Sequence, residues 1–308
     1  PALIHVIFTT WLMNFKRKII ICGATGNQGG AVAAAMLAEG IWNVVALTRD
    51  PQSVAAFRLA AVGASVLKAD TRDLSSLVQA FAGAYGVFGL TQPWCSLKRD
   101  YDIESEIIQG KNIIWACKQA KVSHLIFSSF ISFAEGRTGV SFIDSKLRLE
   151  NILSNQDIPY TILRSAVYME HIDWRNDSKD AGTVSGNYAA KSPIPYTALR
   201  DIGRCSAFIF AEPGKFIRRT IQVTGDVLSG EMIAEILTRL TSRAYRYRSR
   251  SKLWLWFFRP ETYRLRLYLE RSRGYQPAGS AALEMNSMEF PFKNTTVAEF
   301  FKRKLSGL

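Results

Sequence analysis

Cysteine and histidine are scarce in this chain of 308 residues, which contains four cysteines and three histidines. The cysteines, Cys22, Cys95, Cys117 and Cys205, show neither CxxC spacing nor a histidine pair nearby, so the pattern excludes a zinc site of the usual spacing. Three of the four lie in apolar runs. We therefore predict free thiols in the core, a reducing and hence cytoplasmic location, and no metal centre.

Long apolar runs are also missing: the apolar N-terminal run covers residues 1–12, and a bilayer span needs about 20 apolar residues. The basic cluster Lys16-Arg17-Lys18 follows this run, whereas a secretory signal carries its charge first. Met13 is the first methionine, so we expect the functional chain to start near it, with residues 1–15 as an N-terminal extension. The sequence predicts no transmembrane segment.

With 48% hydrophobic and 12% aromatic residues, the chain can bury a sizeable core. Its clearest local pattern lies within residues 18–49. A β-branched strand is expected at 19–22, followed by a glycine-rich stretch at 23–30, an alanine-rich helix at 31–39 that ends at Gly40, and a second strand at 44–48. Strand, turn, helix and strand predict a dinucleotide-binding βαβ unit.

The glycines of this turn are spaced GxxGxxG. Gly23 permits the tight turn, Gly26 lets the backbone approach a pyrophosphate, and Gly29 lets the helix pack closely on the sheet. The free N–H groups and the positive end of the helix then face the phosphates. The remaining residues of the turn are candidate cofactor contacts as well: Thr25, Asn27 and Gln28. This spacing is typical of short-chain dehydrogenases.

Arg49 follows the second strand, twenty residues past Gly29. An acid at this place would hold the adenosine ribose hydroxyls of NAD, whereas an arginine pairs with the 2′-phosphate of NADP. Asp50 favours NAD, but Asp50-Pro51 also looks like the start of the next helix, with proline in its first turn. We therefore favour NADP(H) and keep NAD(H) as the alternative cofactor.

Alternation of strands and helices continues beyond Arg49. Helices are expected at 53–62, 74–81, 100–120 and 145–154, and strands at 64–69, 86–90, 124–128 and 160–163. Repeated βα units predict an α/β fold with a Rossmann-type, doubly wound parallel sheet, in which ligands lie beyond the carboxyl ends of the strands.

Polar pairs follow three of these strands, at the edge where a ligand is expected: Asp70-Thr71, Thr91-Gln92 and Ser128-Ser129. We predict that Asp70 lies near the adenine and that Thr91-Gln92 lies beside the middle of the cofactor. Ordinary turn chemistry is the alternative for each pair.

Further motifs occur in one order between Phe15 and Leu305: the turn at 23–29, Thr48-Arg49-Asp50, the helix Lys146…Glu150, residues 159–164, Tyr168-Met169-Glu170, Asp201-Ile202-Gly203 and residues 296–301. In this order they resemble the NmrA-like family, an atypical branch of the short-chain dehydrogenases and reductases that includes quinone and isoflavone reductases. The resemblance implies a Rossmann domain, a smaller C-terminal lobe, and NADP(H) or NAD(H) in the cleft. Some members are reductases, and others are redox-sensing regulators of protein partners without known turnover.

Typical short-chain dehydrogenases use a tyrosine as general acid, a lysine four residues later on the same helix face, and a serine about thirteen residues upstream that polarises the carbonyl. Ser129 and Lys146 are in place here, but Phe142 stands where the tyrosine would be. Because phenylalanine cannot donate a proton, the ordinary Ser-Tyr-Lys mechanism is excluded.

Two roles for Lys146 are consistent with the sequence. It hydrogen-bonds the nicotinamide ribose in a protein that only binds its cofactor, or it acts as the general acid and base itself, as in isoflavone-reductase-like relatives. A solvated helix lysine without either role is the plain alternative. Quinone reduction demands less of the protein than carbonyl reduction, because solvent can supply the protons.

Residues 164–171 depart from the pattern of the family, whose members often have proline after Arg164 and asparagine in place of His171. We expect this segment to run along the nicotinamide and substrate pocket. Tyr168 and His171 are candidate substitute acids, and packing or solvent exposure is the alternative for both.

After residue 175 the pattern changes. Glycines and prolines between 182 and 195 predict loops and a hairpin, followed by a helix at 201–210, a strand at 219–223 and a helix at 230–240 that Ser229 caps. We predict a Rossmann domain over 16–175 and a smaller α+β lobe over 176–308. The lobe would bind a substrate or a partner and be interwoven with the Rossmann sheet.

Basic residues concentrate in the segment 239–273, which holds eleven Lys and Arg against the two acids Glu261 and Glu270, within a chain of net charge +13. Aromatic residues interleave with this charge, as in some proteins that bind nucleic acids or anionic membranes. No DNA-reading motif is present, so sequence-specific nucleic-acid binding is not expected. The family resemblance implies lid helices with a solvated basic face, and an acidic partner protein or surface is the alternative.

Two functions remain open. The first is an NADPH-dependent oxidoreductase that acts on a quinone-like or aromatic, conjugated small molecule. The second is a non-catalytic dinucleotide sensor whose lobe binds a protein partner, which Phe142 and the basic segment favour.

Overall fold

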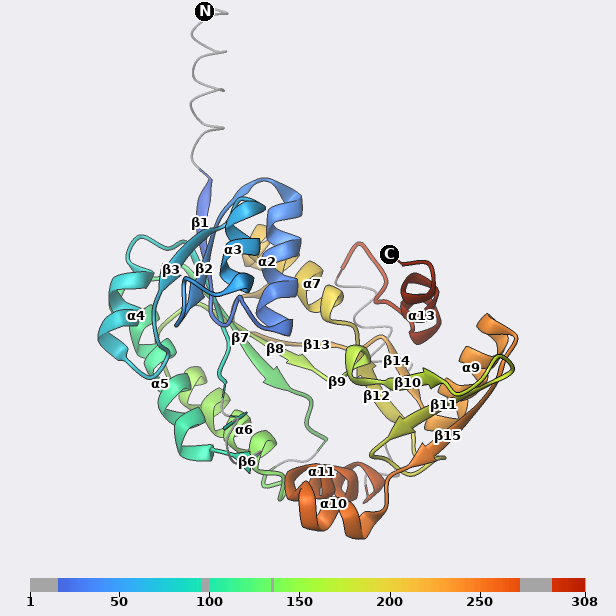
Figure 1. The fold of residues 1–308 in the computed structure, drawn as a ribbon. Helices are drawn as coiled ribbons and strands as arrows, with labels where there is room; N and C mark the ends of the chain where they lie inside the picture. The colour runs from blue at the N-terminus through green and yellow to red at the C-terminus, as the bar shows by residue number, and fades with distance from the viewer. Residues whose placement is uncertain (1–15, 93, 96–99, 134–135, 272–289, 308) are drawn as a thin grey trace, which may run out of the picture.

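Figure 1 shows the computed structural model of the chain, which describes residues 16–92, 94–95, 100–133, 136–271 and 290–307. The predicted N-terminal extension with its start near Met13, and the last two residues of the basic segment, lie outside the described residues.

A parallel sheet of seven strands forms the centre of the fold, in the order β13-β8-β7-β4-β1-β2-β3. Its strands are β1 (Arg17–Ile21), β2 (Trp42–Thr48), β3 (Ser65–Lys68), β4 (Gly86–Gly89), β7 (His124–Phe130), β8 (Tyr160–Ser165) and β13 (Arg219–Val223). The chain runs outward from β1 to β3 and then restarts at β4 on the other side of β1. This confirms the predicted Rossmann-type doubly wound sheet, whose ligand crevice is expected where the order reverses, between β1 and β4.

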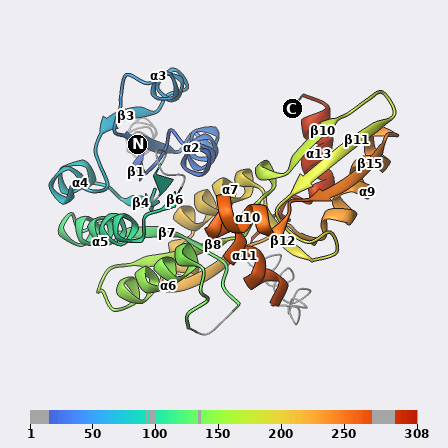
Figure 2. The same cartoon turned by 60° about the horizontal axis from the view of Figure 1, so that its bottom comes forward.

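Helices cover both faces of this sheet (Figure 2). On one face α2 (Asn27–Glu39) packs against α7 (Leu199–Ala211), and on the other lie α4 (Leu74–Phe81), α5 (Ile103–Gln119) and α6 (Ser141–Ser154); α3 (Val54–Ala61) contacts β2 and β3. In β1, Ile19 and Ile21 belong to the first core, and Ile20 to the second. Burial on both faces explains why residues 19–21 of this strand are all apolar.

The remaining chain forms a smaller lobe with two three-stranded sheets, as expected of an α+β lobe. One sheet pairs β10 (Asp173–Asn176), β11 (Ala181–Gly186) and β15 (Ala244–Ser249), and the other pairs β14 (Asp226–Leu228), β12 (Ile194–Thr197) and β9 (Val167–Tyr168). The lobe also holds α9 (Gly230–Thr241), α10 (Lys252–Phe258), α11 (Pro260–Arg271) and α13 (Val297–Leu305), and shorter elements are β5 (Trp94–Cys95), β6 (Asp100–Tyr101), η1 (Met169–His171) and α8 (Pro213–Phe216).

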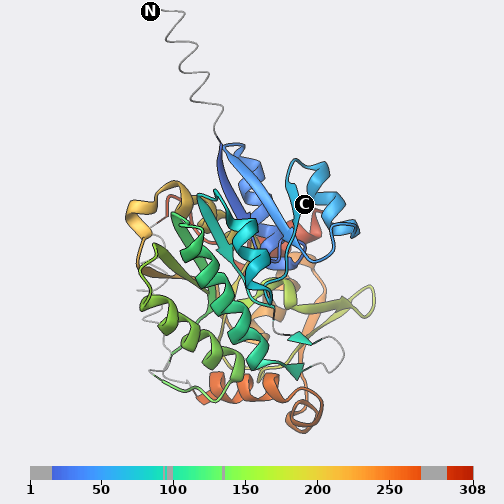
Figure 3. The ribbon, with the colours of Figure 1, turned by 90° about the vertical axis from the view of Figure 1, so that its left-hand side faces the viewer.

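In Figure 3 α5 and α6 lie side by side across the sheet, and α11 lies below them. Two elements from beyond residue 176, α7 and β13, return to the central sheet. The division of the chain at residues 175 and 176 stays a prediction.

Three predicted helix starts are wrong. The alanine-rich helix expected from residue 31 begins at Asn27. The helix expected from residue 100 begins at Ile103, because residues 100–101 form β6 and the Asp102 carboxylate caps the helix by accepting from Ser105 N at 2.9 Å. The helix expected from residue 145 begins at Ser141, whose N–H donates to Glu261 Oε2 at 3.0 Å. That cap comes from 120 residues away, where no local pattern reveals it.

The sequence predicts Pro51 in the first turn of α3, but this helix begins at Val54. Ser53 caps this helix by accepting from Ala56 N at 3.3 Å, and Asp50 instead forms a turn of its own by accepting from Gln52 N at 2.9 Å. A serine two residues after the proline competes better for the cap, because its oxygen reaches the third helical N–H.

Cys22, Cys117 and Cys205 are free and buried, as expected of core thiols. In the described ranges no helix is both long and apolar enough to cross a membrane. The same residues include no group of three or more His, Cys, Asp or Glu side chains arranged to hold a metal ion.

Candidate functional site

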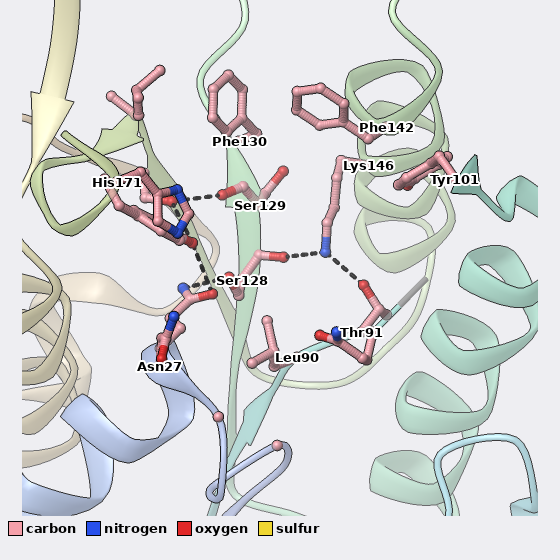
Figure 4. Close-up of a pocket in the computed structure, with 18 of the residues that line it drawn as sticks. Asn27, Leu90, Thr91, Tyr101, Ser128, Ser129, Phe130, Phe142, Lys146 and His171 are labelled. Carbon is pink, nitrogen blue, oxygen red and sulfur yellow. Dashed lines mark hydrogen bonds between the residues drawn. The ribbon is translucent and has the colours of Figure 1, made fainter. Parts of the chain in front are cut away.

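A cavity of about 960 Å³ lies beyond the carboxyl ends of the central strands and extends to the smaller lobe. Most predicted site residues line it: Gly23, Thr25, Gly26, Asn27, Gln28, Arg49, Thr71, Thr91, Gln92, Ser128, Ser129, Lys146 and Tyr168. Gly29 and Asp70 are not part of the lining. Figure 4 shows the part of the cavity around Lys146.

The glycine-rich turn is tightly packed and leaves the N-terminus of α2 open to a ligand. Gly23 has φ +65°, which disfavours other residues, and its carbonyl accepts from Gly26 N at 2.9 Å. A Cβ on Gly29 would lie 2.3 Å from the Gly23 oxygen, so only glycine allows α2 to pack this closely on the turn. No side chain of the described chain caps the N-terminus of α2, which leaves its first N–H groups for an anion.

Arg49 is exposed, lines the cavity, and forms no ion pair within the described part of the chain. Its neighbour Asp50 uses a carboxylate oxygen in its own turn. Asp70 is bound through both oxygens by Arg72, at 3.2 and 2.8 Å, and this bond holds the pKa of Asp70 below its usual range. The structure therefore brings Arg49 to the cavity but turns Asp70 to Arg72.

Helix α5 fixes the loops that follow β3 and β4. Gln109 Oε1 accepts from Thr71 Oγ1 at 3.0 Å and from Gln92 N at 2.8 Å, while its Nε2 donates to Gln92 O at 3.1 Å. Asn112 Nδ2 donates to Thr71 O at 3.1 Å. Sequence reasoning identified Thr71 and Gln92 but missed the two amides that position them.

Lys146 Nζ points from α6 toward the ends of β4 and β7 (Figure 4). It donates to Thr91 Oγ1 at 2.7 Å and to Ser128 O at 3.1 Å, and it lies 3.1 Å from Glu106 Oε1. These three oxygens account for the three N–H bonds of the ammonium group. The Lys146 ammonium group is therefore fixed in the cavity wall by three oxygen atoms, unlike a solvated helix lysine.

Glu106 connects this lysine to other hydroxyl groups. Its Oε1 also accepts from Thr91 Oγ1 at 2.6 Å, and its Oε2 accepts from Ser145 Oγ. Because the Ser145 proton goes to Glu106, Tyr101 OH donates to Ser145 Oγ, at 2.6 Å. One sequence signal points to this network: Glu106 is four and seven residues before Gly110 and Ile113, on the buried side of α5.

Phe142 lies in an aromatic group beside Lys146. Its ring is 5.2 Å from that of Phe130, at an interplanar angle of 82°, and 6.0 Å from that of Tyr101. The place of the usual tyrosine is thus filled by an apolar ring that lines the cavity.

Ser129 has a different partner from the one expected of a catalytic serine. Its hydroxyl donates to Glu150 Oε1 at 2.5 Å, and Arg164 binds the same carboxylate at 3.0 and 2.5 Å. An O–H group has one proton, so Ser129 cannot polarise a substrate while it donates to Glu150.

Tyr168 bridges the cofactor turn and the end of β7. Its hydroxyl donates to Gln28 Oε1 at 3.0 Å, and Gln28 Nε2 donates to Ser128 Oγ at 2.7 Å. Burial raises the pKa of Tyr168 and lowers that of His171, whose ring centroid lies 5.3 Å away. At neutral pH the phenol is therefore protonated and the imidazole is uncharged.

The smaller lobe and α11 form the far end of the cavity. Side chains that line this end are mostly aromatic or apolar: Tyr188, Tyr196, Ile233, Tyr247 and Leu265. Hydrogen bonds join α11 to the Rossmann side: Glu261 accepts from Ser141, and Tyr268 OH accepts from Phe133 N at 2.7 Å. Residues from both parts of the chain therefore enclose one cavity, with a polar end at the glycine turn and an aromatic end under α11.

Known proteins resemble this chain in sequence and in fold. The NmrA-like family matches residues 15–301. The NmrA-like family domain-containing oxidoreductase malD of Malbranchea aurantiaca is 27% identical over 260 residues, which cover 78% of this chain and 77% of the relative.

Solved structures share the fold, among them two with a bound dinucleotide. The negative transcriptional regulator NmrA, solved with NAD, has a TM-score of 0.72 at 17% identity, covering 96% of this chain and 99% of its own. The NADPH-dependent quinone oxidoreductase of Escherichia coli, solved with NADPH, has a TM-score of 0.69 at 20% identity, covering 94% and 99%. From the match over residues 15–301, we conclude that the chain belongs to the NmrA-like family.

Proposed function

We propose that this protein is an NADPH-dependent oxidoreductase that reduces a quinone-like or conjugated aromatic acceptor. The observation that carries the proposal is the continuous cavity in which Lys146 lies between a glycine-rich turn and an aromatic end. A dinucleotide fits the first part and a flat, apolar molecule fits the second.

The residues present fit NADPH, which supplies a hydride when it is bound. The turn from Gly23 to Gln28 and the open N-terminus of α2 would hold its pyrophosphate, and Arg49 its 2′-phosphate. Lys146, Thr91 and Ser128 would hold the nicotinamide ribose. That NADPH- and NAD-bound relatives share this fold supports the cofactor class.

Lys146 is the group placed to handle a proton. Its Nζ is bound to Thr91 Oγ1, and a row of hydroxyls leads from Glu106 through Ser145 to Tyr101 at the cavity. Tyr168 also lines the cavity, but its raised pKa and its bond to Gln28 make it a positioning group. A quinone needs little acid assistance, because the reduced oxygens take protons from solvent. The absence of a tyrosine at Phe142 therefore disfavours carbonyl reduction more than quinone reduction.

The test is NADPH oxidation followed by absorbance with a panel of quinones, conjugated carbonyls and isolated ketones. We expect turnover of quinones and none of isolated ketones. Phe142→Tyr is a matched variant, because it adds only a hydroxyl; it is expected to gain activity on carbonyl acceptors and to leave quinone turnover unchanged. Turnover of isolated ketones by the unmodified protein would contradict the proposal.

A second candidate is a redox sensor that binds the dinucleotide without turnover and contacts an acidic protein partner. The observation that favours it is that all three N–H bonds of Lys146 have partners within the protein. Tight cofactor binding that differs between NADPH and NADP, with no acceptor reduced, would favour the sensor. Because the buried cysteines are free thiols, we propose a cytoplasmic location for either function.

A further inference from the structure

Helix α10 (Lys252–Phe258) exposes an unusual amount of apolar side chain. Five of its seven residues are large, apolar and exposed: Leu253 (76%), Trp254 (40%), Trp256 (56%), Phe257 (73%) and Phe258 (62%). Only Leu255 is buried, in contact with the rest of the fold. A contiguous apolar surface of this kind marks an interaction site.

The surroundings of α10 are strongly basic. Residues 244–264 hold six Lys and Arg and a single acid, Glu261, which is buried and bonded to Ser141 and Arg264. All six basic side chains are exposed: Arg246, Arg248, Arg250, Lys252, Arg259 and Arg264. Within the described residues no ion pair involves Arg246, Arg248 or Arg259. The other three pair with Asp173, Glu270 and Glu261, so the apolar helix is bordered by three cations whose charge no ion pair of the described residues neutralises.

The geometry of α10 decides which occupant fits. A helix that docks into a protein groove presents one stripe of residues three or four positions apart. Here Trp256, Phe257 and Phe258 are consecutive, so their side chains project about 100° apart around the helix axis. A fluid lipid layer can surround aromatic side chains that project in several directions. Tryptophan beside basic residues is typical of the interfacial region of a membrane.

We propose that α10 docks the protein onto an anionic lipid bilayer surface. The apolar side chains of α10 enter the interfacial layer, and the bordering Arg and Lys side chains contact the negatively charged headgroups. This contact is peripheral, because α10 has seven residues and a bilayer span needs about 20 apolar residues.

Docking through α10 would place the aromatic end of the cavity at the membrane. Arg250, which precedes α10, lines the cavity, and so do Thr262 and Leu265 of α11, the helix that packs on α10 (Figure 1). The proposal does not depend on the proposed reaction, since lipid binding is measured without turnover.

The experiment is flotation of the full chain with phosphatidylcholine vesicles, with and without phosphatidylserine. We expect binding only to the vesicles that contain phosphatidylserine, and release at high salt. Phe257→Glu should weaken this binding by about tenfold or more, because an apolar ring that enters the lipid is replaced by a negative charge that the headgroups repel. Phe57→Glu is the matched control, since Phe57 is a similarly exposed phenylalanine (57%) on α3, and it should bind like the unmodified protein.

Three results would overturn the proposal. Absence of binding to both kinds of vesicle, equal binding to both, or equal loss in the two variants would each contradict it. Light scattering without lipid tests whether a second copy of the chain covers α10. If the protein does not bind vesicles, and if it forms a dimer that Phe257→Glu converts to a monomer, α10 serves self-association instead.

Discussion

Lys146 and Glu106 form an ion pair inside the protein, with Nζ and Oε1 3.1 Å apart and with side chains that are 12% and 1% exposed. The pair joins α6 to α5, beside the cavity and forty positions apart in the sequence. A charge at this depth is costly without its partner, because the protein interior solvates it poorly.

Removal of the lysine alone should therefore cost stability. Lys146→Met leaves the Glu106 carboxylate buried without a cation, and we expect the free energy of unfolding to fall by about 3–5 kcal/mol in urea. The double variant Lys146→Met/Glu106→Gln removes both charges and should recover much of this loss. A double variant no more stable than the single one would show that the pair is not coupled.

Arg49 should discriminate between the two cofactors. Loss of a charge-assisted bond to the 2′-phosphate in Arg49→Ala is expected to raise the Kd for NADPH by about tenfold or more, and to leave the Kd for NADH nearly unchanged. The readout is fluorescence titration with each nucleotide. Arg58→Ala is the control: Arg58 is an exposed arginine of α3 outside the cavity lining, and its removal should change neither constant.

Gly29 should not tolerate a methyl group. In Gly29→Ala the new Cβ meets the Gly23 carbonyl oxygen at 2.3 Å, and backbone has to move. We expect a loss of about 1–3 kcal/mol in stability and weaker nucleotide binding, since the same turn holds the pyrophosphate. Gly214→Ala introduces the same methyl group where nothing lies within 4 Å, so a similar loss there would point to a general effect of the substitution.

His124 should make the fold sensitive to acid. Burial lowers the pKa of His124 to about 4, its Nε2 lies 2.8 Å from Thr161 Oγ1, and its Nδ1 has no partner among the described residues. The unfolded chain binds this proton near pH 6.5, so the free energy of unfolding should fall as the pH drops from 6.5 to 4, by about 3 kcal/mol in all.

His124→Gln removes the titrating group and keeps an N–H donor for Thr161. Urea unfolding at pH 7 and pH 5 should show a smaller pH difference for this variant than for the unmodified protein. His171→Gln, at the histidine of the cavity lining whose pKa is also lowered, separates this effect from titration at the cavity. The same pH difference in the unmodified protein and in His124→Gln would rule out His124 as the cause.

Local patterns were sufficient for the central sheet and for the cofactor turn. The strand at 219–223 and the helix at 74–81 have the predicted bounds, because alternation of polar and apolar residues defines the strand locally and the Asp73 cap defines the helix. Gly40 ends α2 with φ +69°, as a C-terminal glycine should.

Long-range contacts account for what sequence reasoning missed. The start of α6 depends on Glu261 of α11, which accepts from Ser141 N. The position of the Lys146 ammonium group depends on its ion pair with Glu106 of α5. The sequence predicts that Ser129 faces the substrate, but its hydroxyl donates a hydrogen bond to Glu150, which Arg164 holds on the same side of the sheet. Spacing along the chain cannot reveal such pairs.

Whether NADPH bound to this protein gives up its hydride decides between an oxidoreductase and a redox sensor. The measurement is stopped-flow absorbance of the NADPH complex mixed with a quinone, for the unmodified protein and for Lys146→Met/Glu106→Gln at nucleotide concentrations that saturate both. We predict rapid, acceptor-dependent oxidation that the double variant slows by about 10²-fold or more, because the nicotinamide ribose loses the lysine that would hold it in place for hydride transfer. Bound NADPH that stays reduced in the unmodified protein across the whole panel of quinones would contradict the proposed oxidoreductase.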